Sequence, residues 1–376
     1  MKTIGFSLML VCGFQASLQA QTNSPPASAN TNAPAASVAP AIVGRSADSR
    51  VWARISSQTN ASGQVSFTTN KAYTELASGL CVRGPDGAWT DAAPVIAPDN
   101  VLGGASATGA RHRVHFAIDA NTASGAIHLV APDGKVFDSR VYGLSYRDSA
   151  TGSNILIAWL QSSQGQLLGK QRVVYLNAFS NLQADLEYVY TLAGLEQNLV
   201  LRESPASPAA YGLNPATTKL QLYTEFFSPP APVKTSIQRN NTAEDILLDF
   251  GAAKIGMGQV FSVQAQGQRT AIPKGRVAKH WTQLDGNRQF LIEEIPYRAI
   301  SNALQKLPLH AANGTPGKDS IQRTASLFPL RPKEAGATAK PGVPILVAKA
   351  ETEGPGLLLD YSIVSANLTN YLFTAD

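Results

Sequence analysis

The stretch from Gln171 to Glu203 constrains the fold most, because its apolar and polar residues alternate with a period of two. Alternation that involves aromatic and branched residues is typical of antiparallel strands with one buried face. The stretch therefore predicts three strands joined by two turns. Asp185 and Glu187 fall on the predicted solvated face, and the predicted core face carries Leu186, Tyr188, Tyr190, Leu199 and Leu201.

The same strand–turn pattern covers most of the chain and predicts a mainly β fold. Pro-Asp-Gly occurs at residues 85–87 and 132–134, which favours type I turns that end in a left-handed glycine. Closely spaced strands without intervening helices predict antiparallel layers packed as a β-sandwich. We expect two β-rich units: a β-sandwich domain at 42–230 and a second unit at 231–376.

The second unit is predicted to contain one short helix and one long loop. Ile300, Leu304 and Leu307 form one apolar stripe over residues 299–307, and Pro308 ends the pattern. Asp285-Gly286 between two strand-like runs predicts a hairpin. Residues 311–341 are rich in Gly, Pro, Ala, Lys and Thr and are predicted to be a loop.

The first residues have the pattern of a signal peptide. Lys2 precedes an apolar run from Ile4 to Phe14, and Ala20 offers a small residue for cleavage. Residues 21–41 are mostly Pro, Ala, Ser, Asn and Thr, which predicts a disordered linker. We therefore expect a secreted, periplasmic or cell-surface protein cleaved near Ala20.

The charge pattern argues against a nucleic-acid partner. The formal net charge is +5, and charged residues make up only 15% of the chain. The basic residues are scattered singly, whereas nucleic-acid binding needs clusters or stripes. No apolar run reaches the ~20 residues of a membrane-spanning helix. Cys12 lies in the predicted leader, so Cys81 is expected to be a free, buried cysteine.

Several stretches together resemble the N-terminal β-rich region of large secreted bacterial proteins of the Rhs/YD-repeat and related surface type. The resemblance is carried by Tyr73–Leu80 followed by Trp89, Ala131–Lys135, Tyr175–Phe179, Ala184–Tyr188, Gly194–Glu203 and Gly356–Tyr361. It implies an exported structural or presentation module and brings no catalytic residues. The chain contains no YD repeats within its 376 residues.

No sequence motif predicts a metal or cofactor site. The five histidines are His112, His115, His128, His280 and His310, and no pair has the i, i+4 spacing of a helical zinc site. His112 and His115 lie three apart on a predicted strand and so point to opposite faces. The preferred interpretation is that the histidines lie on strand or loop surfaces without a metal. Gly143-Leu144-Ser145-Tyr146-Arg147 lacks the final glycine of a nucleophile elbow.

Two groups of residues remain as candidates for function. Asp185 and Glu187 are ~7 Å apart along one strand face, a separation that a glycosidase could use, although the preferred interpretation is that they form the polar face of a one-sided sheet. Among the four tryptophans, Trp159 shares a predicted face with Ile155 and Ile157 and is expected in the core. Trp89 follows a turn and is the candidate for a ligand contact.

The preferred interpretation is an exported, non-catalytic structural or adhesion-type β module of the bacterial cell surface or periplasm. Its expected partners are cell-surface glycans or other surface proteins, and no cofactor is predicted. One alternative is a carbohydrate-binding module, which would present coplanar exposed aromatic rings. The other is a polysaccharide-active enzyme that uses Asp185 and Glu187, which would bring both carboxylates into one groove with a third polar partner.

Overall fold

Nearly every element of the computed structural model is a β-strand, as the alternation predicts. The structure describes residues 39–60, 62–239, 243–265, 267–284, 286–309, 342–348, 354–364 and 372–374. The fold is mainly β with one short helix. The strands before residue 150 are β1 Ala41–Ser46, β2 Ser49–Thr59, β3 Val65–Leu76, β4 Cys81–Arg83, β5 Trp89–Asp91, β6 Ile96–Pro98, β7 Ala105–Ala107, β8 Arg113–Phe116, β9 Ile127–Val130 and β10 Val136–Asp148.

The later elements include the helix α1, Tyr297–Leu304, and a 3₁₀ turn, η1, Pro208–Tyr211. The later strands are β11 Asn154–Trp159, β12 Gly165–Leu168, β13 Arg172–Tyr175, β14 Ala184–Tyr190, β15 Gly194–Leu201, β16 Thr218–Phe227, β17 Val233–Arg239, β18 Ala243–Asp249, β19 Lys254–Ile255, β20 Gly258–Val263, β21 Arg269–Leu284, β22 Arg288–Pro296, β23 Leu346–Val347, β24 Gly356–Val364 and β25 Leu372–Thr374.

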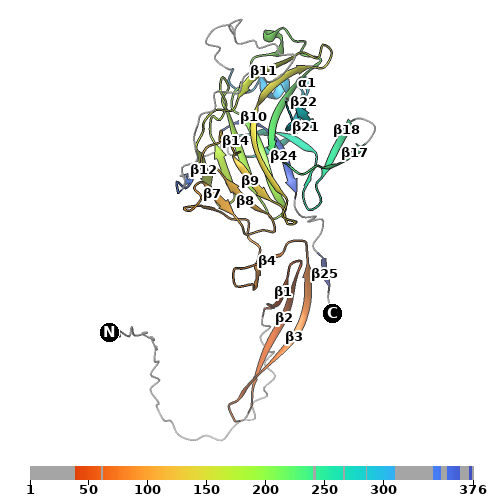
Figure 1. The fold of residues 1–376 in the computed structure, drawn as a ribbon. Helices are drawn as coiled ribbons and strands as arrows, with labels where there is room; N and C mark the ends of the chain where they lie inside the picture. Colours follow the sequence, from red (N-terminus) through yellow and green to blue (C-terminus); the bar gives the residue numbers. More distant parts are fainter. Residues whose placement is uncertain are drawn as a thin grey trace, which may run out of the picture. The chain divides into compact units, whose positions relative to one another are not determined.

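The main sheet is a nearly closed, barrel-like sheet of 15 strands, so the predicted sandwich is wrong. Its order is β23-β12-β13-β14-β15-β24-β20-β21-β22-β16-β10-β9-β8-β7-β6. β24 lies late in the chain but runs beside β15, which comes from the middle of the chain (Figure 1). Strands from both sides of residue 230 thus pair with each other, as β16 does with β22.

One long strand explains why two separate layers do not form. β21 has 16 residues; Arg269–Ala271 and Arg276–Val277 pair with β20, and Ala278–Leu284 pairs with β22. The residues between Ala271 and Arg276 form an irregularity in the β20–β21 pair, and such a bulge bends a strand and increases its twist. The strand therefore joins what would have been two sheets into one. Near the other end of the sheet, Gly104 forms a parallel bridge with Pro344.

Side chains from distant strands meet inside the sheet. The ring of Tyr188 on β14 lies 6.1 Å from the rings of Phe116 on β8 and Tyr175 on β13. Gln197 on β15 accepts a hydrogen bond from the Tyr188 hydroxyl (3.1 Å) and donates one to Thr224 on β16 (3.0 Å). These contacts confirm that the face of β14 predicted to be apolar is the core face.

The prediction that Trp159 lies in the core is wrong, and a bulge is the reason. Leu144 on β10 pairs with Ala158, whereas Ser145 pairs with Leu156, so Ile157 is the extra residue. The extra residue shifts the alternation by one position. Ala158 is therefore buried, and Trp159 is exposed instead of lying in the core.

The smaller sheets are β1-β2-β3-β25 and β4-β5. β2 and β3 form a long hairpin (Figure 1). The Pro-Asp-Gly turns are confirmed, because Gly87 and Gly134 have φ values of 78° and 82° and donate backbone hydrogen bonds to Gly84 and Ala131. The hairpin of β21 and β22 is confirmed as well.

The helix begins and ends earlier than its apolar stripe predicts. It covers Tyr297–Leu304, with Ile300 and Leu304 buried, and Leu307 follows in a turn. Folded structure begins at Ala41, the last residue of the predicted linker. The predicted signal peptide at 1–20, nearly all of the linker at 21–41 and the loop at 311–341 lie outside the described residues.

Candidate functional site

Asp185 and Glu187 lie on the face of β14 that points away from the core, as predicted. Their side chains are not solvated, however, because only 3% of Asp185 and 4% of Glu187 is exposed. The prediction of a solvated polar face is therefore wrong. We call the surface that they share with neighbouring strands the ion-pair face; its charged and amide residues are Arg172, Asp185, Glu187, Glu196, Asn198, Arg202, Arg269 and Asp360.

Arg202 neutralises Asp185. Its Nε donates to Oδ2 of Asp185 at 2.7 Å, and the backbone amide of Asn177 donates to Oδ1 at 2.8 Å. Nη1 of Arg202 donates to the carbonyl of Gly354 at 2.7 Å, which connects this ion pair to the segment before β24. Both oxygens of Asp185 therefore have donors, which suits a structural ion pair.

Glu187 receives hydrogen bonds from three strands. Arg269 on β21 and Asn198 on β15 donate to its Oε1, at 2.6 Å and 3.0 Å. Arg172 on β13 donates to Oε2 at 3.4 Å. A carboxylate held in this way is poorly placed to attack a substrate or to transfer a proton, because both oxygens are already engaged.

Asp360 extends the ion-pair face onto β24 and was missed by sequence reasoning. Burial raises its pKa to about 7, and the nearby carboxylates of Glu196 and Glu187 add to this, whereas Arg269 opposes it. Burial also raises the pKa of Glu196. The available signal was the position of Asp360 after Leu357-Leu358-Leu359, an apolar run that predicts a buried strand.

Trp89, the predicted ligand contact, is half-buried at the start of β5. Its ring packs against a small apolar cluster of Ala77, Leu80 and Cys81. The guanidinium carbon of Arg83 lies 4.7 Å from the ring centroid. The ring therefore already has a cation–π partner within the chain.

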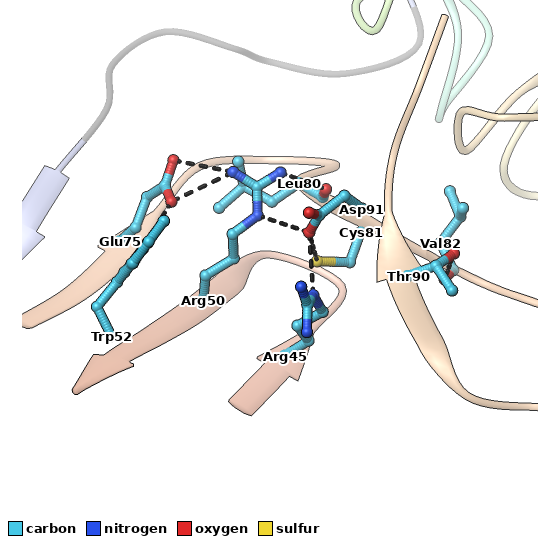
Figure 2. A network of polar contacts seen from close by, with 9 residues as sticks. All are labelled: Arg45, Arg50, Trp52, Glu75, Leu80, Cys81, Val82, Thr90 and Asp91. Carbon is cyan, nitrogen blue, oxygen red and sulfur yellow. Dashed lines mark hydrogen bonds and ion pairs between the residues drawn. The ribbon is translucent and has the colours of Figure 1, made fainter. Parts of the chain in front are cut away.

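Beside that cluster, a polar network joins β1, β2, β3 and β5 (Figure 2). Arg50 lies between two carboxylates: its Nε donates to Asp91 at 3.0 Å, and its Nη1 lies 3.3 Å from both oxygens of Glu75. Arg45 also donates to Asp91 at 3.0 Å, and the Trp52 indole donates to Glu75 at 3.1 Å. The network holds the base of the β2–β3 hairpin.

Cys81 is buried, as predicted, and it lies next to this network. Its side chain is 1% exposed, and its sulfur lies 3.9 Å from Oδ1 of Asp91. Burial raises the pKa of the thiol, although hydrogen bonding from Arg50 acts in the opposite direction. The protonated thiol is a weak nucleophile, so the site does not favour cysteine chemistry.

The histidine prediction needs one correction. His112 is fully buried instead of lying on a surface, and its ring is 4.8 Å from that of Tyr190. Burial lowers the pKa of His112 to about 4. Within the part of the chain that the structure describes, no three His, Cys, Asp or Glu side chains gather closely enough to hold a metal ion.

The described residues contain no helix with the length and apolarity needed to cross a membrane. Comparisons with protein-family models, with curated proteins and with solved structures found no match. The resemblance to Rhs-type proteins thus stays a prediction.

Proposed function

We propose that this chain is an exported, non-catalytic β module of the bacterial cell surface or periplasm that presents the β2–β3 hairpin to other surface molecules. The single observation that carries the proposal is the exposed apolar side of that hairpin. The pairing of Asp185 and Glu187 with arginines supports a shape-holding role over polysaccharide chemistry.

The hairpin has two chemically different sides. Ile55 pairs with Thr69, Ser57 with Phe67 and Thr59 with Val65, and directly paired residues share a side. This side exposes 36% of Ile55, 49% of Val65 and 72% of Phe67. The opposite side carries Arg54, Ser56, Gln58, Ser66, Thr68 and Asn70.

The outer part of the hairpin has no third strand among the described residues. β1 pairs with β2 only as far as Ala53, and β25 pairs with β3 only from Thr74. An isolated two-stranded ribbon is marginally stable in water. Aromatic residues such as Phe67 are typical anchors of binding surfaces, because burying one removes a large apolar area from water. A partner that covers this side would stabilise the two-stranded ribbon and would remove the apolar surface of Phe67 from water.

Replacing Phe67 with serine tests the proposal. We expect Phe67→Ser to weaken binding to immobilised envelope fragments and surface glycans at least about tenfold, since an aromatic anchor typically contributes more than 1.4 kcal/mol. Surface plasmon resonance would measure the affinity, after circular dichroism has shown that the variant is folded. Val101→Ser is the matched control, because Val101 is 82% exposed on a turn outside the hairpin, and this variant should bind normally.

Two results would contradict the proposal. One is equal binding by the wild type and Phe67→Ser, and the other is the absence of binding to any fragment or glycan. If Trp89→Leu lost binding to a glycan while Phe67→Ser retained it, the carbohydrate-binding alternative would replace the present proposal.

A further inference from the structure

A row of polar residues crosses the ion-pair face from β14 to β20. Glu187 pairs directly with Asn198, Asn198 with Asp360, and Asp360 with Gln259. Direct pairs in antiparallel sheets share a face and place their Cβ atoms about 4.5–5.5 Å apart. Asn198 and Asp360 are therefore close neighbours on this face.

Two acceptor atoms in this row lack a donor. Oδ1 of Asn198 and Oδ1 of Asp360 are both buried and have no hydrogen-bond partner among the residues that the structure describes, and the Asn198 side chain is fully buried. A buried acceptor without a donor costs about 1–3 kcal/mol. The arrangement thus calls for a donor between these two residues.

The neighbouring amide groups do not supply that donor. Nδ2 of Asn198 donates to Glu187, and Nε2 of Gln259 donates to the carbonyls of Val260 and Ile272. Exchanging the oxygen and nitrogen of the Asn198 amide would place its oxygen against the Glu187 carboxylate. Two acceptors would then face each other at Glu187 instead of at Asp360, so the exchange does not satisfy both sites. A proton on Asp360 resolves it, because a carboxylic acid donates one hydrogen bond.

We propose that Asp360 is protonated in the native protein and donates to Oδ1 of Asn198, which makes the β15–β24 pair a pH-sensitive contact. When Asp360 ionises, a carboxylate replaces the donor and faces the Asn198 oxygen. The contact between the two strands then weakens, although the backbone ladder from Gly194 to Leu201 remains.

The charged groups around Asp360 favour the protonated form. Glu196 on β15 and Glu187 on β14 repel a charge on Asp360, and Arg269 on β21 attracts it. Because Arg269 is engaged with Glu187 at 2.6 Å, much of its charge is already compensated. Arg172 on β13 is likewise bound to Glu187, and β20 contributes the neutral Gln259. Burial on the core side of β22 is the main cause of the raised pKa of Glu293; a charge on Asp360 would raise it further, and Lys279 opposes this.

The direction of the pH effect follows from proton linkage. The pKa of Asp360 is about 7 in the folded protein, compared with 3.8 for the unperturbed group. Between these values the native state binds the proton and the unfolded state does not, so stability falls as pH rises. This contribution is fully present below pH 3.8 and is lost by a pH slightly above 7. One proton changes the unfolding equilibrium constant by up to about tenfold per pH unit.

The test combines a direct titration with a stability measurement on the full chain. In protein labelled with carbon-13 at the aspartate carboxyl, we expect one resonance to titrate near pH 7 and to be absent from Asp360→Asn. The side-chain amide signal of Asn198 should shift with the same midpoint. Urea unfolding between pH 5 and pH 7 should show a steeper loss of stability in the wild type than in Asp360→Asn, by up to about tenfold in the equilibrium constant per pH unit.

Asp249→Asn is the matched control, because Asp249 on β18 is about a third exposed and its pKa is lowered by the Gly251 amide and Lys254. We expect this variant to keep the wild-type pH slope. A wild-type protein in which every aspartate titrates below pH 5 would overturn the proposal, even if Asp360→Asn failed to fold. An Asn198 signal that does not respond at the midpoint would overturn the pairing with Asn198.

Discussion

Glu293 and Glu294 are adjacent on β22 but experience opposite environments, because neighbouring residues of a strand face opposite sides of the sheet. Burial on the core side raises the pKa of Glu293 well above its ordinary range. Glu294 is also buried, which opposes ionisation, but hydrogen bonds from His280, Lys219 and Gln221 outweigh this and hold its pKa at about 2. The two residues therefore make opposite contributions to pH-dependent stability.

Replacing Glu294 with glutamine should remove stability at neutral pH. A folded-state pKa of about 2, below the ordinary 4.5, gives a contribution that is present above pH 4.5 and is lost as pH falls towards 2. We expect Glu294→Gln to lower the free energy of unfolding by about 1–2 kcal/mol at pH 7, after allowance for solvent screening at the partly exposed His280 and Lys219. Urea titrations at pH 7, 4 and 2.5 would measure this.

Glu293→Gln provides the control in the same strand. Glu293 is neutral in both the folded and the unfolded protein at low pH, so the stability difference between this variant and the wild type should not change below pH 4.5. If the Glu294→Gln deficit stayed constant down to pH 2.5, the ion-pair network around Glu294 would not have the proposed role.

At the residue scale, the sequence predicts which face of a strand a side chain occupies better than it predicts which side chains contact it. The period of two placed Asp185 and Glu187 correctly on the face opposite Leu186 and Tyr188. Their burial was missed because Arg269 lies 82 residues from Glu187 in the chain, and only the folded sheet brings the two together. Nothing in local spacing marks Asn198 as the neighbour of both Glu187 and Asp360.

Single glycines decide how some elements join. Gly104 precedes β7, and its backbone amide donates to Val343 while its carbonyl accepts from Ile345, both at 2.7 Å. A Cβ atom at this position would lie 2.0 Å from the carbonyl oxygen of Phe116, and φ is +70°. Glycine is therefore required where the segment at 342–348 joins the sheet.

We expect Gly104→Ala to destabilise the protein by at least about 2 kcal/mol more than Gly134→Ala, because only the first substitution adds a steric clash to the cost of a left-handed backbone. Gly134 has φ of +82°, and a Cβ atom added there would meet no neighbouring atom within 4 Å, so it is the matched control. Urea unfolding would measure both variants. Equal losses of stability would mean that the close approach at Gly104 is not rigid.

At the element scale, local patterns were predictive wherever no bulge intervened. The Pro-Asp-Gly turns and the β21–β22 hairpin depend on residues adjacent in sequence, and they were predicted correctly. Trp159 was misplaced because one extra residue at Ile157 reverses the alternation. The helix was located correctly from Ile300 and Leu304, but it ends at Leu304 and leaves Leu307 in a turn.

At the scale of the whole molecule, strand alternation does not distinguish a sandwich from a barrel-like sheet, since both have one core face. The distinction depends on β21, whose two halves pair with different neighbours. It also depends on pairs between distant segments, such as β15 with β24. These pairings reflect long-range contacts that a single sequence does not display.

Native-state hydrogen exchange tests the central claim most directly, namely that one continuous sheet supports a hairpin open to partners. The account predicts that amides of β14, β15, β16, β22 and β24 exchange with one shared free energy of opening, as expected for a single cooperative unit. Amides of the outer hairpin, from Ser56 to Asn70, should exchange much faster. Two distinct opening energies divided near residue 230, or an outer hairpin as protected as the core strands, would contradict the account.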